Sequence, residues 1–167
     1  MSIAAALPRP TFAVPAHGVP EALHRGQDDL PFVEFDHGVE MQVLQVDIPT
    51  GLWIVRMRMA PGTTLPTHKH TGEVYAFTIA GSWRYLEYPE VNVAGSYLYE
   101  PAGSVHTLHV PATNKEPTDV WFAIRGPNLN LDEDGNVSLV FDAAFVLSVY
   151  RSRCRKMGLA VPKVIGA

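Results

Sequence analysis

Two stretches of this chain decide its fold: Gly62-Thr-Thr-Leu-Pro-Thr-His68-Lys-His70, and after it Gly95-Ser-Tyr-Leu-Tyr-Glu100-Pro101-Ala-Gly103-Ser-Val-His106. Because a β-strand points alternate side chains to the same face, His68 and His70 can both face one interior. A neighbouring strand, entered through a Pro/Gly turn, can bring His106 to the same point. Three imidazoles around one point suit iron, zinc, copper or nickel better than calcium or magnesium. The pattern predicts a mononuclear metal site inside antiparallel β-structure.

The spacing of the second stretch makes chance a poor explanation. A histidine pair one residue apart is by itself more often a surface pair than a ligand pair. The pattern Gly-x5-Pro-x-Gly-x2-His, however, is expected about once per 10⁵ start positions at average residue usage. Here it follows soon after Gly-x5-His-x-His. We therefore interpret His68, His70 and His106 as one ligand set.

The two stretches resemble motifs 1 and 2 of the cupin superfamily, whose members are small antiparallel β-barrels with a metal held between the sheets. Motif 1 corresponds to residues 62–81 and motif 2 to residues 95–110. The resemblance implies an all-β, antiparallel cupin (jelly-roll) β-barrel in which His68, His70 and His106 bind the metal. It also implies a homodimer, the usual cupin assembly, or a higher homo-oligomer.

One departure from motif 1 bears on the chemistry. Cupins usually carry a fourth ligand, a glutamate, at the position that is Val74 here, while Glu73 lies one residue earlier. Continuing the alternation from the histidines, Val74 faces inward and Glu73 faces away. A bulge near Gly72 would reverse this parity, and that alternative stays open. We expect a three-histidine site without a carboxylate from motif 1.

Within the superfamily, the chain is most similar to small three-histidine, ferrous dioxygenases that cleave carbon–carbon bonds beside carbonyls, such as the acetylacetone and 2,4'-dihydroxyacetophenone dioxygenases. The similarity is carried by residues 70–87 and 99–103. It implies Fe(II) as the cofactor, with Zn(II), Ni(II) or another divalent ion as alternatives. The implied substrates are a small chelating ketone (a hydroxyketone or β-diketone) and dioxygen. The alternative function is a non-catalytic, zinc-binding sensor or regulatory cupin, like the metal-binding domain of certain anti-sigma factors.

Two further residues are candidates for the catalytic site. Glu100 lies six residues before His106, and the resemblance implies that its carboxylate accepts the outer N–H of a metal-bound histidine. Arg84 follows the motif 1 turn, and we expect it to enter the cavity and steady an anionic substrate or oxygen adduct. The alternatives are an exposed glutamate at a strand end and an exposed arginine on a hairpin. His109 has the opposite strand parity to His106 and is not expected to be a ligand.

Strand parity also predicts a small, apolar cavity, which suits an aromatic or aliphatic ketone better than a sugar. The residues expected to line it are Val74, Ala76, Thr78, Leu108 and Val110, and those expected at its mouth are Trp53, Tyr85, Phe122 or Trp121.

Composition agrees with one compact domain. The chain has 167 residues, of which 47% are hydrophobic and 18% charged, so it can bury a core without disulfides. A net charge of -4 argues against nucleic acid or an anionic membrane as a partner. The single cysteine, Cys154, excludes an internal disulfide and a cysteine-based zinc cluster. The N-terminus lacks the features of a signal peptide and no segment is long enough to span a membrane, so a cytoplasmic protein is expected.

Turn and strand signals divide the chain into three regions. Residues 1–30 are expected to form an extended, proline-rich arm, residues 31–141 the β-barrel, and residues 142–167 a helix and tail packed on it. Hairpins are predicted between residues 41–47 and 53–59, between 73–79 and 83–87, and between 128–132 and 137–141. The helix is predicted over residues 143–157, with Asp142 as its N-cap and Gly158 as its stop. Cys154 is then expected to be a small buried residue on this helix.

Overall fold

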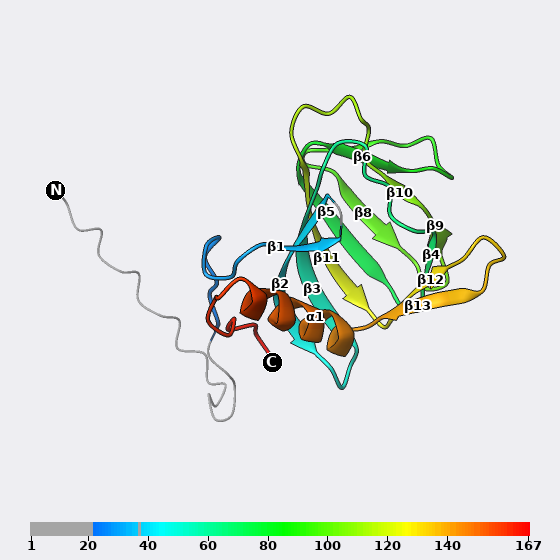
Figure 1. Ribbon diagram of the computed structural model, residues 1–167. Helices are drawn as coiled ribbons and strands as arrows, with labels where there is room; N and C mark the ends of the chain where they lie inside the picture. The colour runs from blue at the N-terminus through cyan, green and yellow to red at the C-terminus, as the bar shows by residue number, and fades with distance from the viewer. Residues whose placement is uncertain (1–21, 37) are drawn as a thin grey trace, which may run out of the picture.

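The computed structural model describes residues 22–36 and 38–167, and most of its regular structure is antiparallel β-strand (Figure 1). Within these residues a single helix, α1 (Ala143–Lys156), follows the last strand. The predicted N-terminal arm lies outside the described residues as far as residue 21. The strands are β1 (Val33–Asp36), β2 (Val39–Asp47), β3 (Leu52–Met59), β4 (His68–His70), β5 (Val74–Ala80), β6 (Ser82–Tyr85), β7 (Asn92–Val93), β8 (Tyr97–Glu100), β9 (Val105–His106), β10 (Leu108–His109), β11 (Thr118–Arg125), β12 (Asn128–Leu131) and β13 (Val137–Phe141).

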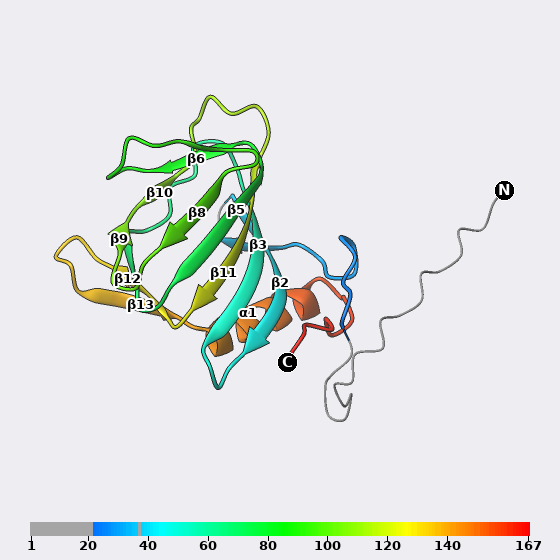
Figure 2. The same cartoon turned by 180° about the vertical axis from the view of Figure 1, so that it is seen from behind.

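The strands form three sheets that curve around an interior (Figures 1 and 2). The largest sheet has the order β1-β2-β3-β11-β5-β8, the second β13-β12-β4-β9, and the third β10-β6-β7. The all-β, antiparallel prediction is confirmed. The described strands do not, however, join into one continuously hydrogen-bonded closed barrel.

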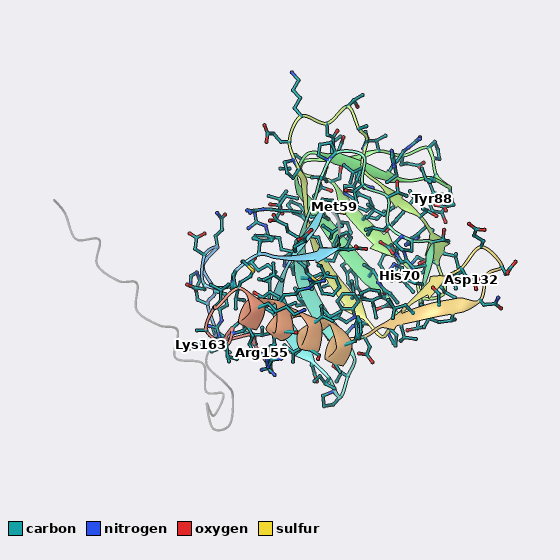
Figure 3. All side chains as sticks on the ribbon, viewed as in Figure 1. Met59, His70, Tyr88, Asp132, Arg155 and Lys163 are labelled. Atoms are coloured by element: carbon teal, nitrogen blue, oxygen red, sulfur yellow. The ribbon has the colours of Figure 1, made fainter. Side chains whose placement is uncertain are left out.

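Period-two alternation places the core between these sheets. In β3 the side chains from Trp53 to Met59 alternate between buried and half-buried positions, with Arg56 and Arg58 on the outer face. Val74 begins the same alternation in β5 and is fully buried. Side chains from all three sheets fill the space between them (Figure 3). The face that each strand turns inward therefore follows from its sequence pattern.

Two of the three predicted hairpins, β2–β3 and β12–β13, are confirmed. The hairpin predicted at residues 80–82 is wrong, because β5 pairs with β11 and β8, whereas β6 pairs with β10 and β7. The chain passes from one sheet to another at Gly81, whose φ of +76° favours glycine. A Cβ on Gly81 would also lie 2.8 Å from the Cα of Thr118. The turn signal was correct, but it marks a crossing between sheets.

The C-terminal helix begins at the predicted residue and ends at Lys156, one residue before the predicted end. The Asp142 side chain accepts a hydrogen bond of 2.7 Å from the Phe145 N–H, which caps the first turn. At the other end Gly158 has a φ of +71°, and the Leu159 N–H donates to the Cys154 carbonyl in a Schellman motif. The helix packs against β1 and β2 on the outside of the sheet, and Cys154 is fully buried there. In the described part of the chain, no helix has the length and apolarity needed to cross a membrane.

A nearly buried carboxylate ties β3 to β11 on the outer face of the large sheet. Asp119 is 6% exposed and accepts two hydrogen bonds from Arg56, at 2.8 and 2.7 Å. The Arg58 Nε donates to the same carboxylate at 3.2 Å, and its guanidinium lies 3.9 Å from the centre of the Phe32 ring. The hydrogen bonds that Arg56 donates to Asp119 raise the pKa of Arg56. This carboxylate keeps two neighbouring guanidinium groups together.

Asp119→Ala is expected to lower the free energy of unfolding by about 2–4 kcal/mol, because it leaves two adjacent guanidinium groups without their shared acceptor. Urea unfolding followed by tryptophan fluorescence measures the change. Glu133→Ala, in the exposed β12–β13 turn, is the matched control and should stay within about 0.5 kcal/mol of the wild type. A loss at Asp119 no larger than that of the control would show that the ion pair does not hold the two strands together.

Candidate metal centre

Three histidines meet in the interior of the protein. His68 and His70 lie at the two ends of β4, and His106 on β9 pairs in register with His68. Their side chains are buried, at 8%, 3% and 1% exposure. One ring nitrogen of each lies within 4.8 Å of the other two. The structure thus confirms that the three predicted histidines converge, in a site suited to a divalent metal.

The outer nitrogens of two of these histidines are held by oxygen acceptors. His68 Nδ1 donates to the Pro66 carbonyl at 2.8 Å, and His70 Nδ1 donates to the Asn128 Oδ1 at 2.7 Å. Because these oxygens can only accept, each Nδ1 carries the hydrogen, and each Nε2 presents its lone pair to the shared interior point. The sequence interpretation missed Asn128. It lies on β12, opposite His70 in the β12–β4 pair.

Glu100 lies beside the Nε2 atoms of His70 and His106. Its carboxylate is 3% exposed, and Oε2 lies 2.9 Å from His70 Nε2 and 3.1 Å from His106 Nε2. Its other oxygen, Oε1, accepts a hydrogen bond of 2.5 Å from the Tyr85 hydroxyl. The Tyr85 ring stacks on His106 with 3.6 Å between ring centres. The sequence predicted that Glu100 accepts from an outer nitrogen. For His68 and His70 the outer nitrogens instead donate to Pro66 and Asn128, and Glu100 lies beside the other nitrogen of His70.

The protonation of the site suits a cation. Burial lowers the pKa of His68 to about 4, and the neighbouring histidines add to this, so the imidazole is neutral at pH 7. Burial by itself would raise the pKa of Glu100, but the close His106 and His70 imidazoles outweigh it and lower the pKa to about 2. A neutral imidazole at His68 and an ionised carboxylate at Glu100 are the protonation states that metal binding requires.

Two buried atoms of the site lack hydrogen-bond partners in the described structure: Glu100 Oε2 and His106 Nε2. They lie 3.1 Å apart but without hydrogen-bond geometry. Buried polar atoms without partners cost free energy, and a divalent ion between them would satisfy both. The residues present therefore fit a bound metal, which His68, His70 and His106 would hold.

The position usually given to a fourth ligand is apolar here, as the sequence indicates. Val74 is fully buried and pairs in register with Glu100 of β8. Glu73 accepts a hydrogen bond of 3.0 Å from the Tyr75 hydroxyl. Because Glu73 and Tyr75 share one face of the strand, opposite to that of Val74, the alternative in which a bulge turns Glu73 toward the metal does not occur.

Arg84 does not enter the cavity, which corrects the sequence expectation. In β6 the side chains of Trp83 and Tyr85 are buried, and Arg84 between them is exposed. Arg84 pairs in register with His109 of β10, whose Nδ1 contacts the Thr64 hydroxyl at 2.8 Å. The inward residue of β6 is therefore Tyr85, which the sequence analysis had placed only at the mouth of the cavity.

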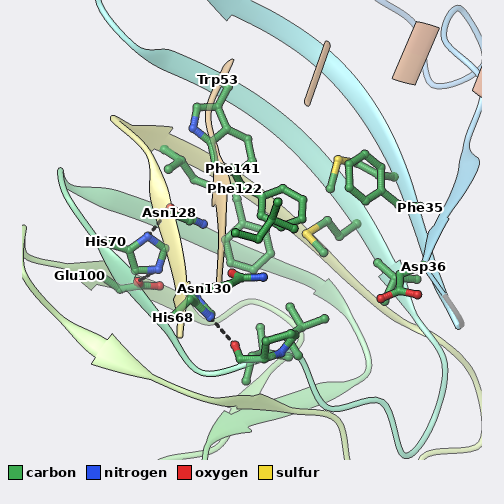
Figure 4. A pocket seen from close by; sticks show the side chains of 18 of the residues that line it. Phe35, Asp36, Trp53, His68, His70, Glu100, Phe122, Asn128, Asn130 and Phe141 are labelled. Atoms are coloured by element: carbon green, nitrogen blue, oxygen red, sulfur yellow. Dashed lines mark hydrogen bonds and ion pairs between the residues drawn. The ribbon is translucent and has the colours of Figure 1, made fainter. Parts of the chain in front are cut away.

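His68 and His70 open onto a cavity of about 250 Å³ (Figure 4). Its walls are mainly apolar, and Asn128 and Asn130 supply polar groups beside the histidines. Of the predicted residues, Leu108, Trp53, Tyr85 and Phe122 line it. The remaining predicted residues, Val74, Ala76, Thr78, Val110 and Trp121, do not line it. The other lining residues are Phe35, Asp36, Val39, Met41, Met57, Leu65, Pro66, His68, His70, Glu100, Ile124, Asn128, Asn130, Leu139 and Phe141.

Comparison with known proteins identifies the family. Residues 21–128 match the family model of the ChrR cupin-like domain. The chain belongs to this cupin family. A cupin-like protein of unknown function from Ralstonia eutropha JMP134 is 37% identical, with a TM-score of 0.74 over 78% of this chain and 81% of that chain. No curated protein matches the sequence.

Two further cupin structures are similar in fold. An acetylacetone dioxygenase from Acinetobacter johnsonii has a TM-score of 0.70 at 18% identity, over 85% of this chain and 98% of that chain. The complex of SigE with the anti-sigma ChrR from Rhodobacter sphaeroides has a TM-score of 0.50 at 17% identity, over 60% of this chain and 51% of that chain. At these identities the likeness shows the cupin fold alone, so function must be argued from the site.

His106→Ala is expected to abolish retention of a divalent metal, because a site built on three monodentate imidazoles cannot spare one. Metal content per chain after dialysis, measured by mass spectrometry, checks this. His109→Ala removes a histidine of the same segment that lies outside the site, and it should keep the wild-type content. A full equivalent of metal in His106→Ala would contradict the ligand assignment.

Asn128→Leu is expected to weaken metal affinity by about 10- to 100-fold, because it removes the acceptor that orients His70. Competition with a chromophoric chelator measures the dissociation constant. Asn128→Asp keeps an acceptor oxygen at the same place and should restore most of the affinity. Equal affinities for the leucine variant and the wild type would mean that Asn128 does not orient the ligand.

Proposed function

We propose that this cupin is a metal-dependent dioxygenase that cleaves a carbon–carbon bond beside a carbonyl in a small chelating ketone, with Fe(II) as its ion. The observation that carries the proposal is the position of His68 and His70 at the wall of a mainly apolar cavity of about 250 Å³. Structural metal sites are closed by protein ligands, whereas catalytic sites keep positions open to a substrate. A buried site that faces a ligand-sized chamber matches the second kind.

The cavity suits a small ketone with an apolar body. Aromatic side chains of Trp53, Phe122 and Phe141 face the space next to the histidines (Figure 4). They would pack on an aryl or alkyl group and exclude water. The Asn130 side chain lies beside His68 and offers an amide donor to a substrate oxygen. Asn128 and Asn130 lie near the metal ligands, whereas Asp36 lies on the opposite side of the cavity (Figure 4). The polar groups near the histidines would orient the carbonyl end of a substrate toward them.

When bound, a ferrous ion would supply Lewis acidity toward two substrate oxygens and a binding position for dioxygen. The protein would hold this ion with neutral imidazoles, so that most of its charge remains to favour an ionised, enolate-like substrate. For a hydroxyketone the overall reaction consumes one dioxygen, breaks the bond between the carbonyl and hydroxyl carbons, and gives two carboxylic acids. Both oxygen atoms of dioxygen end in the products, so no external reductant is needed.

The second candidate function is a zinc-binding regulatory cupin. The family match to the ChrR cupin-like domain favours it, because the ChrR structure is that of an anti-sigma factor bound to SigE. A regulator would bind Zn(II) through the same histidines and would need no reaction with dioxygen. A regulatory function of this kind does not explain the apolar cavity beside the histidines. A cytoplasmic location and a homodimer remain predictions for either function.

Oxygen uptake by anaerobically Fe(II)-loaded protein tests the proposal. With aryl and alkyl hydroxyketones and β-diketones as a panel, we expect uptake that needs both Fe(II) and ketone, with one dioxygen consumed per ketone cleaved. Zn(II)-loaded protein and His106→Ala should be inactive, and His109→Ala should remain active. Full metal loading without uptake from any ketone of the panel would reject the dioxygenase and favour the regulatory cupin.

A further inference from the structure

We propose that Glu100 is a fourth metal ligand, binding through Oε2 alone, so that the centre has three histidines and one glutamate supplied by β8. This proposal rests on the metal centre and not on the dioxygenase reaction. It gives Glu100 a different role from the one that the sequence implied, that of an acceptor for an outer imidazole nitrogen.

The distances around Glu100 are those between neighbouring ligands of one ion. Nitrogen and oxygen ligands lie about 2.0–2.2 Å from a transition metal, so two of them at a right angle are about 2.8–3.1 Å apart. Glu100 Oε2 lies 2.9 Å from His70 Nε2 and 3.1 Å from His106 Nε2. Both residues belong to the three histidines that converge on one interior point, and in His70 the Nδ1 is already held by Asn128, which leaves Nε2 for the ion. The carboxylate oxygen therefore occupies a position beside them in the same coordination sphere.

Tyr85 fixes the orientation of the carboxylate. Its hydroxyl donates to Oε1, which leaves Oε2 facing the histidines. The tyrosine ring is 5% exposed and stacked on His106. Because Oε1 is held by the Tyr85 hydroxyl and Oε2 is the oxygen beside the histidine nitrogens, Glu100 would bind an ion through Oε2. Tyr85 acts through Glu100 and His106 and is a positioning residue.

The β5–β8 pairing explains why the carboxylate comes from β8. Val74 occupies the position that carries the fourth ligand in many cupins, and it pairs directly with Glu100. Residues opposite each other in an antiparallel pair point to the same face of the sheet. A glutamate on either strand can therefore reach the same interior, and in this chain the acidic residue is on β8.

A fourth, anionic ligand changes what the ion can accept. It reduces the net charge of a divalent centre by one and leaves two positions on an octahedral ion, the number that a bidentate ketone needs. The proposed reaction with dioxygen would then require Glu100 to give up its position when substrate arrives.

Cobalt binding to the metal-free protein tests the proposal without reference to activity. Glu100→Ala should bind Co(II) more than about 100-fold less tightly than the wild type, a larger loss than removal of an orienting partner causes. Acetate replaces the missing carboxylate, so millimolar acetate should strengthen Co(II) binding and restore the wild-type visible spectrum in this variant. The same acetate should not strengthen binding to the wild type or restore binding to His106→Ala.

Two further variants keep the test decisive. Tyr85→Phe keeps the ring stacked on His106 and removes only the hydroxyl, so it should weaken Co(II) binding less than Glu100→Ala and not respond to acetate. Glu100→Gln keeps the volume and the acceptor for Tyr85, and it serves if the alanine variant does not fold. A folded Glu100→Ala variant with wild-type affinity and spectrum, or with lost affinity that acetate does not restore, would overturn the proposal. A folded Glu100→Gln variant, whose side chain leaves no space for acetate, would overturn it by keeping the wild-type affinity and spectrum. An inactive wild type with these cobalt results would reject the dioxygenase and leave the fourth ligand in place.

Discussion

Lone pairs from three imidazoles and one carboxylate converge in a desolvated interior, and the rest of the structure depends on this arrangement. Burial keeps His68 neutral, and Glu100 stays ionised beside His70 and His106. These nitrogen and oxygen lone pairs repel one another unless a cation lies among them. Removing them from water also costs free energy, and contacts with the surrounding apolar side chains do not compensate for this cost. The interior is therefore most stable with an ion bound, so that metal binding and folding are thermodynamically linked.

The four-stranded sheet assembles the metal centre and the cavity together. β4 has three residues, too few for an independent strand, and it is held between β9 and β12. The same pairing with β12 places Asn128 against His70. The pairing that holds β4 in the sheet therefore also orients the His70 ring. β13, on the far side of β12, adds Leu139 and Phe141 to the cavity wall. A change in the register of β12 would disturb the ion and the chamber at once.

The sequence predicted what depends on local spacing and strand parity. The three histidines, the inward Val74 and the capped C-terminal helix belong to this group, because each follows from residues within a few positions of one another. Asn128 could not be found in this way, since it meets His70 through a pairing between segments 58 residues apart.

Arg84 and Glu100 show two further limits of the sequence. The inward face of β6 depends on the crossing between sheets at Gly81, which a hairpin signal does not distinguish from a tight turn. The inward direction of Glu100 was foreseeable from motif 2, but the nitrogen that it meets depends on which outer nitrogens Pro66 and Asn128 already hold. Because Glu100 lines the cavity and lies beside His70 and His106, its charge is close both to the metal centre and to any molecule in the chamber. A ligand that brings its own negative charge must compete with Glu100 for the ion, whereas a neutral one need not. The occupant of the chamber and the ligands of the ion are thus coupled, whether the protein uses that coupling to react with a ketone or to sense one.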